Sequence, residues 1–152
     1  TVAWTEGTGQ AVYMRPNPDI VPVACIPHSA LATKKARGLL PSAVPFADAV
    51  FNVSRSALLV AAMTGDPRLL MAATDDKLHQ QQRREAMPRS LDLVAKLREA
   101  GIPAAISGAG PTVLALASRD TAPLVAGLVG ARFDVVELGI DPVGATVIAL
   151  DA

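Results

Sequence analysis

The 152-residue chain is 51% hydrophobic, with a mean hydropathy of +0.35, which is enough to bury the core of one domain and excludes a disordered chain. Its 14 Lys and Arg residues balance 14 Asp and Glu residues and only 3% of residues are aromatic, so it lacks the positive field and stacking surfaces that nucleic-acid and anionic-membrane binding require. The single cysteine excludes an intrachain disulfide, and no apolar run is expected to reach the length of a bilayer, so the sequence predicts a soluble, cytoplasmic protein.

The first predicted elements are strands. Residues 2–4 and 11–14 flank a polar, glycine-containing connection typical of a hairpin, and residues 20–26 predict a third strand, so we expect one antiparallel sheet. Within the third strand, Pro22 indicates an edge position or an irregular start, and Cys25 is expected to be a small buried thiol. Because a strand pattern begins at the first residue, residues 1–26 are expected to continue a sheet from a missing amino-terminal half, and residues 27–152 to form the following domain.

A block of helices follows. Residues 32–40 predict a short helix on which Thr33 and Arg37, four residues apart, share one face and can hold a ligand together. The alternative is an exposed arginine on a polar face, with a threonine near the helix start. Residues 45–64 predict a long helix ending at Gly65, and residues 67–73 a second short one. The long helix is expected to bury a set of apolar residues at helical spacing, namely Phe46, Val50, Val53, Ala57 and Val60.

The middle of the chain becomes polar from Asp75 to Glu85, a pattern typical of a solvated helix face. His79 has no second histidine or cysteine at ligand spacing, so no metal site is predicted. Ser90 is expected to cap a helix that runs to Glu99, ends at Gly101, and turns three residues inward: Leu93, Val94 and Leu97.

Two apolar strands, residues 104–106 and 112–116, are joined by Ser107, Gly108, Ala109, Gly110 and Pro111. The two glycines permit positive φ, so this stretch is either a hairpin turn or a loop that packs against a ligand. A helix over residues 121–130 follows, capped by Asp120 or Thr121, with Pro123 in its first turn and three buried residues, Leu124, Val125 and Leu128. Final strands are predicted at residues 133–138 and 146–150. The order predicts an α+β fold, with helices packed against a largely antiparallel sheet.

Four motifs, taken in order, resemble the C-terminal half of the homoserine kinases, members of the GHMP small-molecule kinase superfamily. They are Thr33-Lys-Lys-Ala-Arg37 followed by Leu40-Pro41, then Asn52-Val-Ser-Arg55, then Asp76 with Arg83 seven residues later, then Ile106-Ser-Gly-Ala-Gly-Pro-Thr112. The resemblance covers residues 2–116 well and the last strands loosely.

The resemblance implies a ferredoxin-like C-terminal domain of an enzyme that transfers the γ-phosphoryl group of ATP to the hydroxyl of L-homoserine, in threonine biosynthesis. It assigns substrate binding to Thr33, Arg37 and Arg83, with Arg84 the competing candidate by proximity. It also assigns the third superfamily motif, beside the phosphate-binding loop, to Ser107, Gly108, Ala109 and Gly110. Asn52, Ser54 and Arg55 are expected to be scaffold residues.

No catalytic or metal-binding residue is expected in this chain. The resemblance places ATP and Mg²⁺ mainly in the missing N-terminal half, since no Gly-x-x-x-x-Gly-Lys-Ser/Thr pattern or glycine-serine loop is present here. The expected partners are L-homoserine, that N-terminal half and a second copy in a homodimer.

Three alternatives stay open. A sibling GHMP kinase of the mevalonate-pathway or galactose type shares the third motif and the architecture. A non-catalytic α+β domain that binds an amino acid or another subunit also fits, because the phosphate loop is missing. In the third, the chain is one cleavage product whose first strand pairs with the other segment, or with a second copy through its exposed edge.

Overall fold

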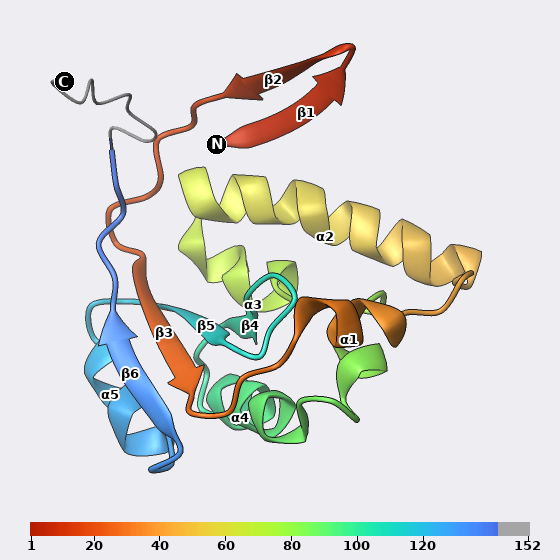
Figure 1. Cartoon of the computed structure of the whole chain (residues 1–152). Helices are drawn as coiled ribbons and strands as arrows, with labels where there is room; N and C mark the ends of the chain where they lie inside the picture. The colour runs from red at the N-terminus through yellow and green to blue at the C-terminus, as the bar shows by residue number, and fades with distance from the viewer. Residues whose placement is uncertain (143–152) are drawn as a thin grey trace, which may run out of the picture.

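The structure is a computed structural model that describes residues 1–142, apart from the side chain of Lys35 (Figure 1). The strands are β1 (Val2–Glu6), β2 (Thr8–Val12), β3 (Val21–Pro27), β4 (Ala104–Ile106), β5 (Val113–Ala117) and β6 (Phe133–Glu137). The helices are α1 (Thr33–Gly38), α2 (Phe46–Thr64), α3 (Leu70–Ala73), α4 (Pro88–Glu99) and α5 (Ala122–Leu128), with two 3₁₀ turns, η1 (Pro67–Leu69) and η2 (Gln81–Arg83). The strand predicted at residues 146–150 lies outside the described residues.

A four-stranded sheet organises the chain from β3 onward. Its strand order is β4-β5-β3-β6 and each pairing is antiparallel, which is the ferredoxin-like arrangement of a β-α-β-β-α-β chain and confirms the predicted α+β fold. β3 is an inner strand, since Cys25 lies opposite Val113 of β5 and Val135 of β6. The edge position suggested for Pro22 is therefore wrong. This proline is the second residue of the strand, where its missing N–H is tolerated.

The hairpin of β1 and β2 is a separate two-stranded sheet, drawn in red at the top of Figure 1. Val2 lies opposite Val12, and Gly7 makes the turn with φ of 74°. The prediction of a hairpin is confirmed, but the single sheet expected from the first three strands is wrong, because β3 pairs with β5 and β6 instead. The division of the chain at residue 26 stays a prediction.

The core lies on both faces of the four-stranded sheet. Because successive side chains of a strand point to opposite faces, β5 sends Val113, Ala115 and Ala117 into one cluster with α4 and α5, and Leu114 and Leu116 into another with α2 and α3. The first cluster includes the inward residues predicted for α4, which confirms them: Leu93, Val94 and Leu97. On α5 the prediction is confirmed for Val125, which is fully buried, and wrong for Leu124, which is 57% exposed.

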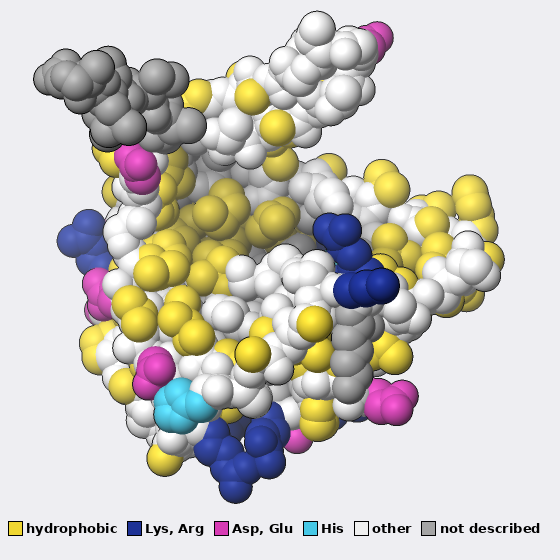
Figure 2. All heavy atoms as spheres, in the orientation of Figure 1, with side chains coloured by type: hydrophobic (Ala, Val, Ile, Leu, Met, Phe, Trp, Pro, Cys, Tyr) yellow, Lys and Arg dark blue, Asp and Glu magenta, His cyan; other side chains and the backbone are white. Residues whose placement is uncertain are grey.

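Helix α2 turns the face predicted to be core toward solvent. Phe46 is 84% exposed and Val53 is 71% exposed, while the inner cluster is contacted by Leu58, Leu59 and Met63. In Figure 2, hydrophobic side chains gather along the outer end of this helix and in a hollow beneath the hairpin. α2 is also long and apolar enough to cross a bilayer by length and composition, contrary to the expectation from sequence. Only 6% of that stretch is buried, although the C-terminal half of the helix packs on the sheet.

Candidate functional site

The glycine loop between β4 and β5 is a tight turn that is hydrogen-bonded to Ser90 of α4. Gly108 has φ of 56° and Gly110 has φ of 81°, which confirms that the loop uses the left-handed freedom of glycine. The loop closes on itself, since the Ser107 amide donates to the carbonyl of Thr112 at 2.9 Å. Ser90 Oγ donates to the carbonyl of Pro111 at 2.6 Å. The predicted capping role of Ser90 is therefore wrong: the α4 cap position belongs to Met87, and the serine anchors the loop.

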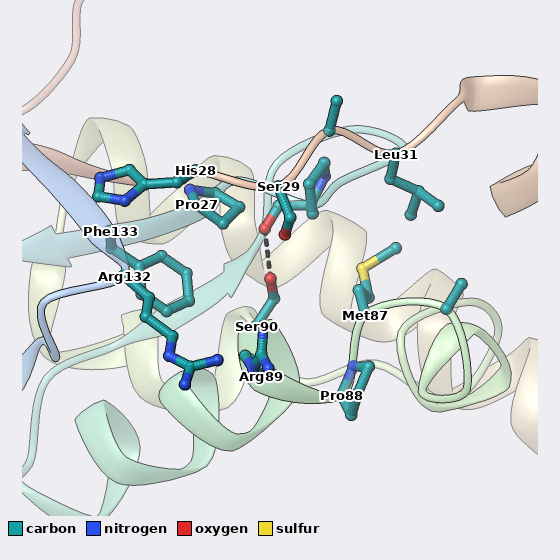
Figure 3. A pocket seen from close by; sticks show the side chains of 13 residues that line it. Pro27, His28, Ser29, Leu31, Met87, Pro88, Arg89, Ser90, Arg132 and Phe133 are labelled. Carbon is teal, nitrogen blue, oxygen red and sulfur yellow. Dashed lines mark hydrogen bonds between the residues drawn. The ribbon is translucent and has the colours of Figure 1, made fainter.

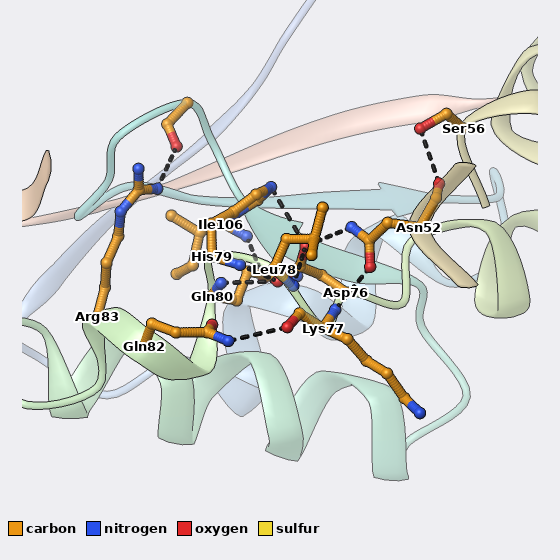
Figure 4. A network of polar contacts seen from close by, with 11 residues as sticks. Asn52, Ser56, Asp76, Lys77, Leu78, His79, Gln80, Gln82, Arg83 and Ile106 are labelled. Atoms are coloured by element: carbon orange, nitrogen blue, oxygen red, sulfur yellow. Dashed lines mark hydrogen bonds and ion pairs between the residues drawn. The ribbon is translucent and has the colours of Figure 1, made fainter. Parts of the chain in front are cut away.

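Arg83 connects this loop to α1. Its side chain comes from η2, and the residue is only 7% exposed. Nε donates to the carbonyl oxygen of Ala36 at 3.2 Å. Nη1 donates to the carbonyl oxygen of Gly108 at 3.3 Å, and this bond is drawn in Figure 4. A guanidinium carries five N–H donors, and the two bonds found among residues 1–142 use two of them.

The turn that precedes Arg83 is organised by the carboxylate of Asp76, whose side chain is 5% exposed. It accepts from Nδ2 of Asn52 at 2.8 Å and from the amides of His79 at 2.9 Å and Gln80 at 2.7 Å (Figure 4). Burial alone raises the pKa of a carboxyl group, but the hydrogen bonds from Gln80, His79 and Asn52 outweigh it and lower the pKa of Asp76.

The prediction of a solvated helix face from Asp75 to Glu85 is wrong for Asp76, Gln80 and Arg83, whose polar groups turn inward, although Asp75, Lys77, Gln81, Arg84 and Glu85 are exposed. Gln80 is 7% exposed, and its Oε1 accepts from the buried amide of Ile106 at 2.8 Å, at the end of β4. In the sequence, Asp76 serves only as the spacing reference that selects Arg83, and Asn52 is expected to be a scaffold residue; the structure shows what it supports, since its side chain holds Asp76 and the Lys77 amide. The available signal was an aspartate just before a short helical turn, where its side chain caps free amides.

Thr33 and Arg37 lie on the exposed side of α1, as their spacing predicts, while Ala36 on the same helix is fully buried. The structure brings the backbone of α1, the guanidinium of Arg83 and the glycine loop together. Within residues 1–142, no hydrogen bond links the side chains of Thr33 or Arg37 to that group. Arg84 points elsewhere: it forms an ion pair with Asp92 at 2.8 Å on the surface.

A cavity of about 510 Å³ lies beside this group rather than within it. It opens between the end of β3, the start of α4 and the start of β6, and Figure 3 shows His28, Arg89 and Arg132 on one side of it and Met87 on the other. None of Thr33, Arg37 and Arg83 lines it. His28 is already engaged with Asp134, at 3.0 Å between Nε2 and Oδ1. In the described part of the chain, no group of three or more His, Cys, Asp or Glu residues could hold a metal ion.

Residues 57–134 match the family model described as GHMP kinases C terminal. A homoserine kinase of Streptomyces coelicolor is 52% identical to this chain, over 99% of the chain and 49% of the relative. A homoserine kinase of Clavibacter michiganensis is 43% identical, over 99% of the chain and 50% of the relative. The crystal structure of homoserine kinase from Cytophaga hutchinsonii has the same fold, with a TM-score of 0.78 and 24% identity over 87% of this chain and 45% of that one. The chain spans about half the length of the relatives it matches.

Proposed function

The chain belongs to the GHMP kinase family by its C-terminal domain, and from this premise we propose that it is the substrate-binding half of a homoserine kinase. The complete enzyme transfers the γ-phosphoryl group of ATP to the side-chain hydroxyl of L-homoserine. The choice of homoserine over mevalonate-type or galactose-type acceptors is supported by relatives that carry this name and match nearly the whole chain.

One observation of the structure carries the assignment of the site. Arg83 is buried and fixed through two backbone carbonyls, one on α1 and one in the glycine loop, with donors left over. Planar donors held in this way suit a carboxylate, which accepts two parallel hydrogen bonds from a guanidinium. Thr33 and Arg37 complete the proposed substrate site from the exposed face of α1. A hydroxyl and a second positive charge there suit the same amino acid.

Phosphoryl transfer depends chiefly on positioning and charge stabilisation, so an anchored acceptor is the main contribution this half can make. In the proposal, Ser107, Gly108, Ala109 and Gly110 border the phosphate-binding loop of the N-terminal half, and that half holds ATP with Mg²⁺. A cytoplasmic location suits an enzyme that consumes ATP in amino-acid biosynthesis. A homodimer is included because, among residues 1–142, β1 and β2 pair only with each other and so present strand edges to a second copy.

A complementation assay tests the proposal. The N-terminal half of the Streptomyces coelicolor relative is fused to this chain, and ADP release is measured with homoserine, mevalonate or galactose as acceptor. We expect ADP release that depends on homoserine from the fusion and none from the chain alone.

ADP release with another acceptor but not with homoserine would overturn the substrate assignment. Ordinary turnover by the 152-residue chain alone would overturn the placement of ATP in the other half. Separate titrations with homoserine and ATP distinguish a simple binding module, which would bind the amino acid and leave the fusion inactive.

A further inference from the structure

Asp76 accepts hydrogen bonds at both oxygens of its carboxylate. Oδ1 accepts from Asn52 Nδ2 at 2.8 Å and from the Leu78 amide at 3.2 Å, whereas Oδ2 accepts from the amides of His79 and Gln80 at 2.9 and 2.7 Å. These donors come from α2 and from the turn that follows the carboxylate. The group is therefore the point at which the helix and the turn are joined.

Asn52 fixes the direction of this carboxylate from the side of α2. Its Nδ2 donates to Asp76, and its Oδ1 accepts from the amide of Lys77 at 2.9 Å. One amide side chain thus holds two consecutive residues of the turn. Because α2 packs on the sheet through Leu58 and Leu59, the turn is set relative to the core.

Two sets of hydrogen bonds connect the turn to the proposed substrate site. In the first route, the side-chain oxygen of Gln80 accepts a hydrogen bond from the amide of Ile106, the residue just before the glycine loop. The backbone carbonyl of Gln80 accepts from the Arg83 amide at 3.1 Å and begins the 3₁₀ turn from which the guanidinium reaches Ala36 and Gly108. Figure 4 shows these residues as one continuous set between α2 and the loop.

We propose that Asp76, oriented by Asn52, is a positioning residue that holds the Arg83 guanidinium and the 107–111 loop in register for the acceptor substrate. This inference rests on the proposed function and deepens it. Asp76 touches no substrate in this account; it acts through Arg83 and through Gln80.

Asp76→Asn in the complete enzyme tests the inference. The new side chain keeps the shape but replaces one oxygen with an NH₂ group. In either orientation, this NH₂ group faces N–H donors, so either the donors at Oδ1 or those at Oδ2 lose their acceptor. We expect the KM for homoserine to rise about fivefold or more, with the KM for ATP unchanged within about twofold. We also expect faster hydrogen exchange at Arg83 Nε–H and at the Ile106 amide, measured by NMR.

Two controls separate positioning from loss of stability. Asp75→Asn makes the same chemical change one residue earlier, at a carboxylate that is half exposed and lies 3.6 Å from Arg98. Thr74→Val removes a buried hydroxyl that donates to Leu70 and accepts from Arg98, so it weakens the fold without touching the turn. Neither is expected to raise the KM for homoserine or the exchange rate of Arg83 Nε–H.

An unchanged KM for homoserine in Asp76→Asn, or an equal rise in Thr74→Val at equal loss of melting temperature, would overturn the inference. If the complete enzyme does not phosphorylate homoserine at all, the proposed function fails, and the exchange measurements decide the positioning on their own. Unchanged exchange at Arg83 and Ile106 in Asp76→Asn would then refute it.

Discussion

The two left-handed glycines of the loop differ in their surroundings. A Cβ on Gly108 would meet no atom within 4 Å, whereas a Cβ on Gly110 would lie 2.7 Å from Met87 Cε and Sδ and 3.0 Å from Ile106 Cγ2. Met87 is 3% exposed but lines the neighbouring cavity, so its flexible end can relieve part of this contact. At both positions the positive φ disfavours any residue with a Cβ. At Gly110 the neighbouring side chains also leave too little space for one.

Gly108→Ala should lower the free energy of unfolding by about 1–2 kcal/mol, the cost of left-handed backbone alone. Gly110→Ala should lower it by about 2–4 kcal/mol, since overpacking against Met87 adds to that cost. Urea unfolding of the two variants measures the difference. Equal losses would mean that Met87 gives way freely. In a double-mutant cycle, Gly110→Ala should cost less in a Met87→Ala background than in the parent chain.

Arg83→Lys keeps the positive charge but removes the planar fork and the bond from Nε to Ala36. In the complete enzyme we expect the KM for homoserine to rise on the order of tenfold, with little change in the KM for ATP. Arg84→Lys, one residue away and paired with Asp92 on the surface, is the matched control. A KM for homoserine that does not move in Arg83→Lys removes this arginine from the site.

Residue types alone do not tell whether a polar side chain faces water. Asp76, Gln80 and Arg83 are buried because each meets a hydrogen-bond partner that is remote in sequence. The partners are the Asn52 side chain on α2, the Ile106 amide of β4 and the Ala36 carbonyl of α1, respectively. The spacing of Asp76 and Arg83 could be recognised in the sequence. Their joint use of the backbone could not.

At the scale of elements, the helices begin and end close to the proline and glycine residues that mark their limits in the sequence. The starts and ends of α2 and α4 lie within a few residues of those predicted from Pro45, Gly65 and Gly101, since proline and glycine act on the local backbone. The buried face of α2 could not be predicted in the same way. This helix carries apolar residues on more than one side, so its period does not say which side meets the sheet.

Phe46→Ser should change the free energy of unfolding of this chain by no more than about 0.5 kcal/mol, because the ring is 84% exposed. Leu70→Ala, at 2% exposure in the cluster that α2 covers, should cost about 2–5 kcal/mol. Chemical denaturation compares the two. A large loss in Phe46→Ser would mean that the outer face of α2 is covered, by another molecule or by residues outside the described range.

At the scale of the whole molecule, the order of elements predicts the α+β class but not which strands pair. Three strands in succession suggest one sheet, yet β3 joins β5 and β6, with Val23 and Cys25 in the core cluster of α4 and with Ala24 buried on the opposite face. The exposed hairpin has no such alternation of buried residues and stays apart.

Cys25 reports on the integrity of this sheet. It is fully buried on an inner strand, and burial raises the pKa of its thiol to about 11. At pH 8 we expect a disulfide reagent to modify it only as fast as the sheet opens, so labelling should accelerate in parallel with unfolding by urea, and Cys25→Ser should abolish it. Rapid labelling without denaturant would contradict the structure.

The raised pKa of Cys25 also predicts a dependence on alkaline pH. A thiol that is harder to ionise in the folded state contributes stability that is complete below pH 9 and is lost as pH rises from there through about 11. The free energy of unfolding should therefore fall over that interval, and less so in Cys25→Ser.

Trp4 is the single tryptophan of the chain and lies on β1, where it is 45% exposed. Among the residues that the structure describes, its hairpin shares no hydrogen-bonded strand with the main sheet. Its fluorescence therefore describes the hairpin and little else. Denaturation should shift the emission maximum only as far as the half-covered ring becomes exposed, so circular dichroism is the better signal for folding of the four-stranded sheet. A blue shift of the emission, in contrast, would show that another surface covers Trp4 on the hairpin. The size of the shift could then be used to titrate that contact without an added label.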